Sequence, residues 1–117
     1  MGPKNLLEPA AALAAAKAAK KPLALVFLQE DELRSRLLLQ ALADPAVGAE
    51  VLDQVVLARV PFDKDAEDAK RWKVTAPGVM ALVDVGPDEP KLLKLSKIPD
   101  ARVLRRDLDA ALKTVTK

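Results

Sequence analysis

Apolar and polar residues alternate in blocks along the chain, and three of the apolar blocks are typical of buried strands. The runs PLALVFL (22–28), VVLARV (55–60) and GVMALVDV (78–85) are rich in Val and Leu and almost continuous. Strands covered by helices on both faces show such runs, because neither face contacts water. A shorter run, KLLKL (91–95), follows the turn GPDEP, and so tight a connection favours an antiparallel hairpin. The pattern therefore predicts four strands.

Helical patterns fill the segments between these runs. Helices are predicted near residues 6–20, 32–43, 46–53 and 66–73, and from 99 onwards. Helices between buried strands predict a sheet that begins parallel, to which the hairpin adds an antiparallel edge. The leucines of the second helix spread over more than one face, so we expect it to be buried on more than one side. Trp72 shares a face with two alanines and is expected to anchor in the core.

The composition excludes several kinds of chemistry. The chain has 117 residues, enough for one domain that we place over residues 1–117. It contains no Cys, His or Tyr. Thiol catalysis, disulfides and thiolate metal sites are therefore impossible, and the commonest general base and metal ligand is missing. We expect no cofactor and no bound metal.

The charge and the N-terminal pattern bear on partners and compartment. The net charge is only +2, and lysines and arginines are interspersed with acids, so we expect no nucleic-acid or membrane partner. The apolar run PAAALAAA ends at Lys17 and is too short to span a bilayer. We favour a cytoplasmic location; an upstream signal that has been removed is the alternative.

The ordered landmarks resemble the thioredoxin-like fold across nearly the whole chain. KPLALVFL is similar to the first central strand of that family, and VPFDKDAEDAKRWKV to the strand end, acidic turn and helix before its proline loop. VTAPGVMALVDVGPDEPKLL is similar to the proline loop with the hairpin that follows. The resemblance implies a three-layer α/β sandwich, with a mixed sheet of about four strands flanked by helices and an extra N-terminal helix.

The resemblance also implies where the family's chemistry would lie. It places Glu32 and Ser35 at the positions of the paired cysteines of active thioredoxins, so dithiol exchange is absent. It implies a cis Ala76–Pro77 peptide bond, since the family's loop proline is cis. Ser35 has no histidine to activate it. The acids Glu30, Asp31 and Glu32 suit a helix start better than a cation site.

We therefore predict a redox-inactive domain that binds a protein or peptide without covalent chemistry. Active relatives hold peptides against the backbone before the loop proline, which implies Thr75, Ala76 and Pro77 here. The facing wall would be Gln29 to Leu33, that is Gln29, Glu30, Asp31, Glu32 and Leu33. The first alternative is a structural or oligomerisation domain, which would act as a homodimer or as part of a larger protein or assembly. The second is an enzyme with non-thiol chemistry.

Overall fold

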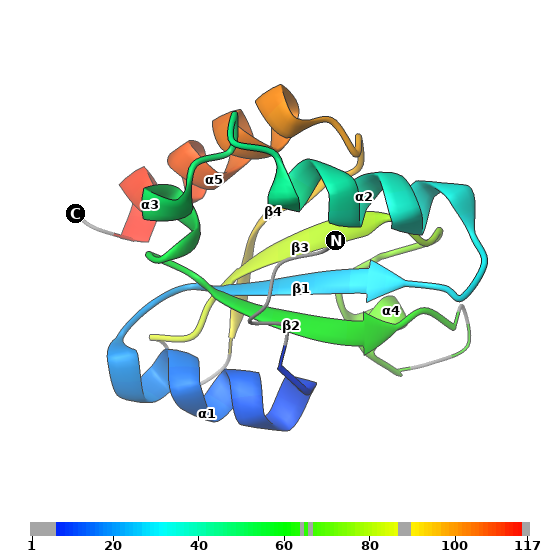
Figure 1. Ribbon diagram of the computed structural model, residues 1–117. Coiled ribbons are helices and arrows are strands. Elements are labelled where there is room, and N and C mark those ends of the chain that lie inside the picture. Colours follow the sequence, from blue (N-terminus) through cyan, green and yellow to red (C-terminus); the bar gives the residue numbers. More distant parts are fainter. Residues whose placement is uncertain (1–6, 64, 66, 87–89, 116–117) are drawn as a thin grey trace.

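The computed structural model describes residues 7–63, 65, 67–86 and 90–115, and its elements follow the order expected from the sequence (Figure 1). The helices are α1 (Pro9–Ala19), α2 (Leu33–Ala43), α3 (Ala49–Leu52), α4 (Glu67–Arg71) and α5 (Ala101–Val115). The strands are β1 (Leu23–Leu28), β2 (Val56–Pro61), β3 (Val79–Asp84) and β4 (Lys91–Ser96). Helix α1 starts later than the sequence suggests, because Pro9 takes its first position and Glu8 is extended.

The strands form one mixed sheet in the order β2-β1-β3-β4. Strands β1 and β2 are parallel, as a helical crossover requires. Strand β3 is antiparallel to β1 although a helix precedes it, and β4 is antiparallel to β3. The parallel start and the hairpin are thus confirmed, and the reversal lies between β2 and β3. As a result the beginning of β3 lies beside the end of β1, where Phe27 is opposite Val79.

The sheet is covered on both faces, so its central strand is wholly buried. Every residue of β1 is buried, and successive side chains enter two different apolar clusters. Ala24, Val26 and Leu28 join the cluster beneath α2, α3 and α5. The other three pack with α1 and with Trp72, whose exposure of 7% confirms it as a core residue. Figure 1 shows these two helical layers above and below the sheet.

Two helices differ from expectation in how they are buried or bounded. In α2, Leu38 and Leu42 are buried, but Leu33 is 61% exposed and Leu37 38%. The expectation that this helix is buried on more than one side was therefore wrong, since no second layer covers its outer face in the described part of the chain. Helix α4 is shorter than the segment 66–73, because the chain turns through a left-handed residue, Lys73, with φ 59°.

No helix in the described ranges has the length and apolar composition needed to cross a membrane.

Candidate functional site

Three loops meet at the end of the sheet where β1 and β2 finish and β3 begins. The N–H of Gly78 donates to the carbonyl of Phe27 over 2.8 Å, and the N–H of Phe62 donates to the carbonyl of Leu28 over 2.7 Å. Gln29 therefore leaves the sheet between the chain that follows β2 and the proline loop, residues 75–78. The structure brings the predicted wall and the predicted loop to the same end of the sheet.

Glu32 and Ser35 form a closed cap on the first turn of α2. One carboxylate oxygen of Glu32 accepts hydrogen bonds from the Ser35 N–H (2.7 Å) and the Ser35 hydroxyl (3.0 Å). The other oxygen accepts from the Arg34 N–H at 3.0 Å. The Ser35 oxygen in turn accepts from the Gln29 N–H at 2.9 Å. The cap satisfies N–H groups that the first helical turn leaves unpaired.

These bonds set the ionisation of Glu32. The hydrogen bond from the Arg34 N–H has the largest effect on the Glu32 carboxyl and lowers its pKa. Burial, the next largest effect, opposes it, but weaker bonds from the N–H and hydroxyl of Ser35 keep the pKa below its ordinary value. The Arg34 guanidinium acts in the same direction. Ser35 is only 3% exposed, so its hydroxyl cannot reach a substrate. The two residues therefore have a structural role, which is to cap the first turn of α2.

The neighbouring acids stand apart from this cap. Glu30 and Asp31 are exposed, and Asp31 takes a left-handed conformation with φ 57° that turns the chain into α2. Within the described ranges, no group of three or more potential ligands is close enough to hold a metal ion. The carboxylate of Glu32 already accepts three hydrogen bonds within the cap.

The proline loop departs from the expected geometry. The described residues contain no cis peptide bond, so Ala76–Pro77 is trans, and the expectation of a cis bond was wrong. The trans form is the ordinary state of an X–Pro bond. Here the sharp change of direction falls on the next residue, because Gly78 has φ 76°. A Cβ atom at Gly78 would lie 2.5 Å from the Cβ of Arg34, so the loop lies directly against α2.

The loop leaves backbone groups open. Thr75 is exposed, whereas Ala76 and Pro77 are half-buried. No hydrogen bond within the described part of the chain uses the backbone N–H or carbonyl of Thr75 or Ala76. Exposed Leu33 begins α2 in the neighbouring segment. The loop therefore offers unpaired backbone groups, and its Gly78 lies against Arg34, the residue that follows exposed Leu33.

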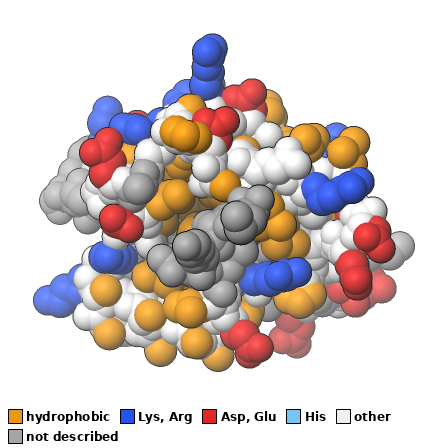
Figure 2. Space-filling model, viewed as in Figure 1, with side chains coloured by type: hydrophobic (Ala, Val, Ile, Leu, Met, Phe, Trp, Pro, Cys, Tyr) orange, Lys and Arg blue, Asp and Glu red, His pale blue; other side chains and the backbone are white. Residues whose placement is uncertain are grey.

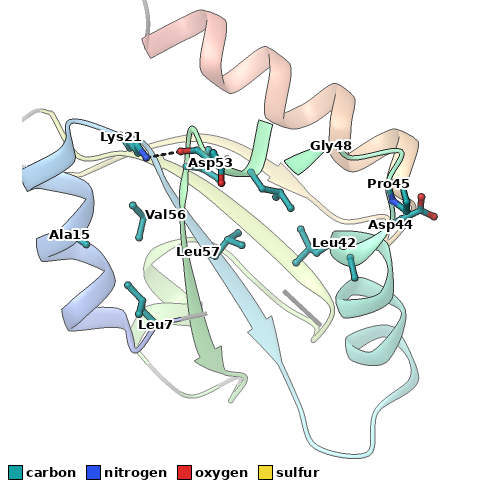
Figure 3. A pocket seen from close by; sticks show the side chains of 13 residues that line it. Leu7, Ala15, Lys21, Leu42, Asp44, Pro45, Gly48, Asp53, Val56 and Leu57 are labelled. Carbon is teal, nitrogen blue, oxygen red and sulfur yellow. Dashed lines mark hydrogen bonds between the residues drawn. The ribbon is translucent and has the colours of Figure 1, made fainter. Parts of the chain in front are cut away.

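A separate groove lies at the opposite end of the sheet, where β2 begins (Figure 3). It has a volume of about 700 Å³, and the Lys21 ammonium at its edge donates to the carbonyl of Asp53 over 2.6 Å. It is lined by Leu7, Ala15, Lys21, Leu42, Ala43, Asp44, Pro45, Gly48, Leu52, Asp53, Val55, Val56 and Leu57. None of the predicted site residues is among them. The lining residues come from several elements that are separated along the chain, so no sequence motif marks the groove.

The comparisons with known proteins concern the fold. No family model matches the sequence, and no curated protein sequence matches it. Among solved structures, a thioredoxin from Thermus thermophilus superposes with a TM-score of 0.74 at 19% identity, over 94% of this chain and 87% of that one. A disulphide isomerase from Xylella fastidiosa Temecula1 gives 0.63 at 20% identity, over 92% and 88%. Chloroplastic thioredoxin z gives 0.62 at 13%, over 97% and 98%.

The chain therefore has the thioredoxin-like fold, with a four-stranded mixed sheet and a helix before β1. It has that fold without a single cysteine. The resemblance predicted from the sequence is confirmed at the level of the fold. The confirmation comes from the arrangement of strands and helices, whereas the Ala76–Pro77 bond differs from the expected cis form.

Proposed function

We propose that this chain is a redox-inactive thioredoxin-like domain that binds an extended segment of another protein without covalent chemistry. The observation that carries the proposal is the open backbone at Thr75 and Ala76, in the loop whose Gly78 lies against Arg34, the residue after exposed Leu33. An extended peptide can pair with such groups as an added strand, while a nearby apolar side chain contributes contact area. No cysteine is present to form a mixed disulfide, so the complex would be reversible.

The closed cap supports this proposal over an enzymatic one. A catalytic Ser needs an exposed hydroxyl and a base that can take its proton. Ser35 is buried, and its partner Glu32 already accepts from two backbone N–H groups and has a lowered pKa. A carboxylate with a lowered pKa is a weak base, so Glu32 is poorly suited to take a proton from Ser35. The pair instead supports a structural role next to the proposed peptide site.

A screen of random peptides displayed on phage tests the proposal. Peptides that bind the unmodified chain should lose at least about tenfold in affinity to Thr75→Arg, because a long charged side chain beside Ala76 obstructs the added strand. Leu33→Arg should weaken binding as well. Thr114→Arg is the matched control, since Thr114 is exposed on α5 and its hydroxyl bonds only within that helix. Peptides that bind both site variants as tightly as the unmodified chain would show that binding lies elsewhere.

A second candidate, self-association, is favoured by one observation. Leu33 and Leu37 are both exposed on α2 and lie four residues apart, on the same face of the helix. Covering such a pair is one reason for a domain to assemble. Light scattering across a concentration series discriminates: a dimer that Leu37→Lys converts to a monomer supports assembly. A monomer at every concentration argues against it.

A further inference from the structure

The groove at the start of β2 lies on the outer edge of the sheet. Strand β2 is an edge strand, and the N–H of Val56 donates to the Pro22 carbonyl, on the β1 side, over 3.0 Å. Because the N–H and carbonyl groups of a strand alternate between its two sides, those of Val55 and Leu57 point away from β1. Both residues line the groove, so the outer edge of β2 opens into it (Figure 3).

One extended residue already pairs with this edge. The Leu7 N–H donates to the Leu57 carbonyl over 3.0 Å, and the Leu7 carbonyl accepts from the Arg59 N–H over 2.8 Å. These two bonds form a parallel bridge to β2. The pairing cannot continue toward the end of β2, because Pro9 and Pro61 occupy the next bridge and neither has an N–H to donate.

The bridge that would precede Leu7 has no described partner for β2. It would use the Val55 carbonyl and the Leu57 N–H, and no hydrogen bond in the described part of the chain uses either group. Leu57 is only 4% exposed, and Val55 is 6% exposed. Backbone groups of buried residues are almost always paired, since an unpaired one costs free energy. A partner for these two groups is therefore expected.

The direction of the chain indicates which segment can reach them. In a parallel ladder the bridge before Leu7 falls two residues earlier, at Asn5, which belongs to residues 1–6 outside the described ranges. Side chains alternate between the two faces of a strand. Leu7 lies opposite Ala58, which belongs to the apolar cluster on the α1 side, so Leu6 would face the other cluster, beside Leu57.

Both walls of the groove suit an apolar segment. On the α2 side the apolar lining residues are Leu42, Leu52, Val55 and Leu57. On the α1 side the groove is lined by Ala15 and Leu7, and Figure 2 shows hydrophobic side chains gathered over α1. A leucine that enters from β2 would therefore exchange water for apolar contacts.

We infer that the groove holds the chain's own N-terminal segment, in which Asn5 pairs with the edge of β2 and the Leu6 side chain enters the groove. The segment would add a further strand, parallel to β2, to the four-stranded sheet and would cover the apolar wall. The inference goes beyond the proposed function, because it concerns the opposite end of the sheet from the proline loop.

Amide hydrogen exchange of the unmodified chain, followed for each residue by NMR, tests the inference. The Leu57 amide should exchange slowly, like that of Arg59, whose hydrogen bond to Leu7 makes it an internal reference. Leu6→Asn should accelerate exchange at Leu57 by at least about tenfold, because a polar side chain is unfavourable in an apolar groove. Leu6→Met keeps a similar apolar volume and should retain the protection. Ile98→Asn is the control at an exposed position after β4 and should also retain it.

The outcomes distinguish the possible occupants. Rapid exchange at Leu57 in the unmodified chain would overturn the inference, and so would protection that Leu6→Asn leaves unchanged. Protection that grows with protein concentration would show a second copy in the groove instead of the chain's own segment. Protection that appears only after a phage-selected peptide is added would assign the groove to a partner, and the inference would again fail. Peptide binding that depends on Thr75 is measured separately, so the proposed function stands or falls on its own.

Discussion

At the scale of single residues, a cap of two polar side chains holds the start of α2. Glu32 accepts three hydrogen bonds from Arg34 and Ser35, and Ser35 accepts one from Gln29. The N–H groups of Arg34 and Ser35 in the first turn of α2, and that of Gln29 before it, thereby gain a partner. The side chains of Glu32 and Ser35 are therefore engaged within the fold, which gives them a structural role at the start of α2.

The cap predicts a pH dependence of stability. Because the folded state lowers the pKa of Glu32, its carboxylate stabilises the fold above the unfolded-state pKa of about 4.3, and this contribution is lost as the pH falls through the lowered folded-state value. Glu32→Gln should therefore unfold at a lower temperature at neutral pH and match the unmodified chain at about pH 2. Thermal unfolding followed by circular dichroism at both pH values measures this.

Glu30→Gln is the neighbouring control, since the Glu30 side chain makes no hydrogen bond within the described ranges. It should leave the pH profile unchanged. An identical pH profile for Glu32→Gln and the unmodified chain would show that the cap contributes nothing to folding.

At the scale of elements, the site depends on the close contact of the proline loop with α2. Gly78 has φ 76°, and its Cα lies so near Arg34 that an added Cβ would be 2.8 Å from the Arg34 carbonyl carbon. The Gly78 N–H also holds the end of β1. The close contact at Gly78 thus limits how far the unpaired backbone of Thr75 and Ala76 can lie from residues 29–33.

Replacing that glycine tests the contact. Gly78→Ala should destabilise the fold by about 2 kcal/mol or more, because a left-handed conformation and a backbone clash both oppose the methyl group. It should also weaken any peptide that depends on Thr75. Chemical denaturation and peptide titration measure the two effects.

Gly86→Ala is the matched control for this change. Its new Cβ would approach only the Asp84 carboxylate oxygen, at 3.2 Å, and Gly86 is outside the left-handed region. A cost for Gly78→Ala no larger than that for Gly86→Ala would contradict the close contact.

At the scale of the whole molecule, one sheet joins two apolar clusters. Each residue of β1 belongs to one cluster or the other in alternation, so neither layer of helices can detach without exposing a face of the same strand. Trp72 is in one cluster and Leu108 in the other. The chain is therefore expected to unfold as a single cooperative unit.

The lone tryptophan makes this cooperativity measurable. Leu108→Ala removes a fully buried side chain from α5 and should lower the free energy of unfolding by about 2–5 kcal/mol. Trp72 fluorescence, which reports the opposite face, should shift to the same lower midpoint as far-ultraviolet circular dichroism. Leu33→Ala, at an exposed position, should leave both midpoints almost unchanged. A Trp72 midpoint that stays in place in Leu108→Ala would contradict a single unit.

The sequence by itself determined the elements, their order and the absence of thiol chemistry. Continuous apolar runs mark a strand buried on both faces because burial acts on each residue directly, and β1 is such a strand. The buried stripe of α5, with Leu104, Leu108, Ala111 and Leu112, follows from its spacing for the same reason. These are local consequences of which side chains avoid water.

Only the tertiary structure decided which polar groups meet and which apolar ones stay exposed. The turn at Gly78 depends on the close approach of the proline loop to α2, and the exposure of Leu33 depends on the absence of a covering layer among the described residues. Asp107 is 2% exposed on α5 because it faces β4, where the Lys94 ammonium lies 3.6 Å away. Such features arise between segments that are distant along the chain, so the pattern within one segment carries no record of them.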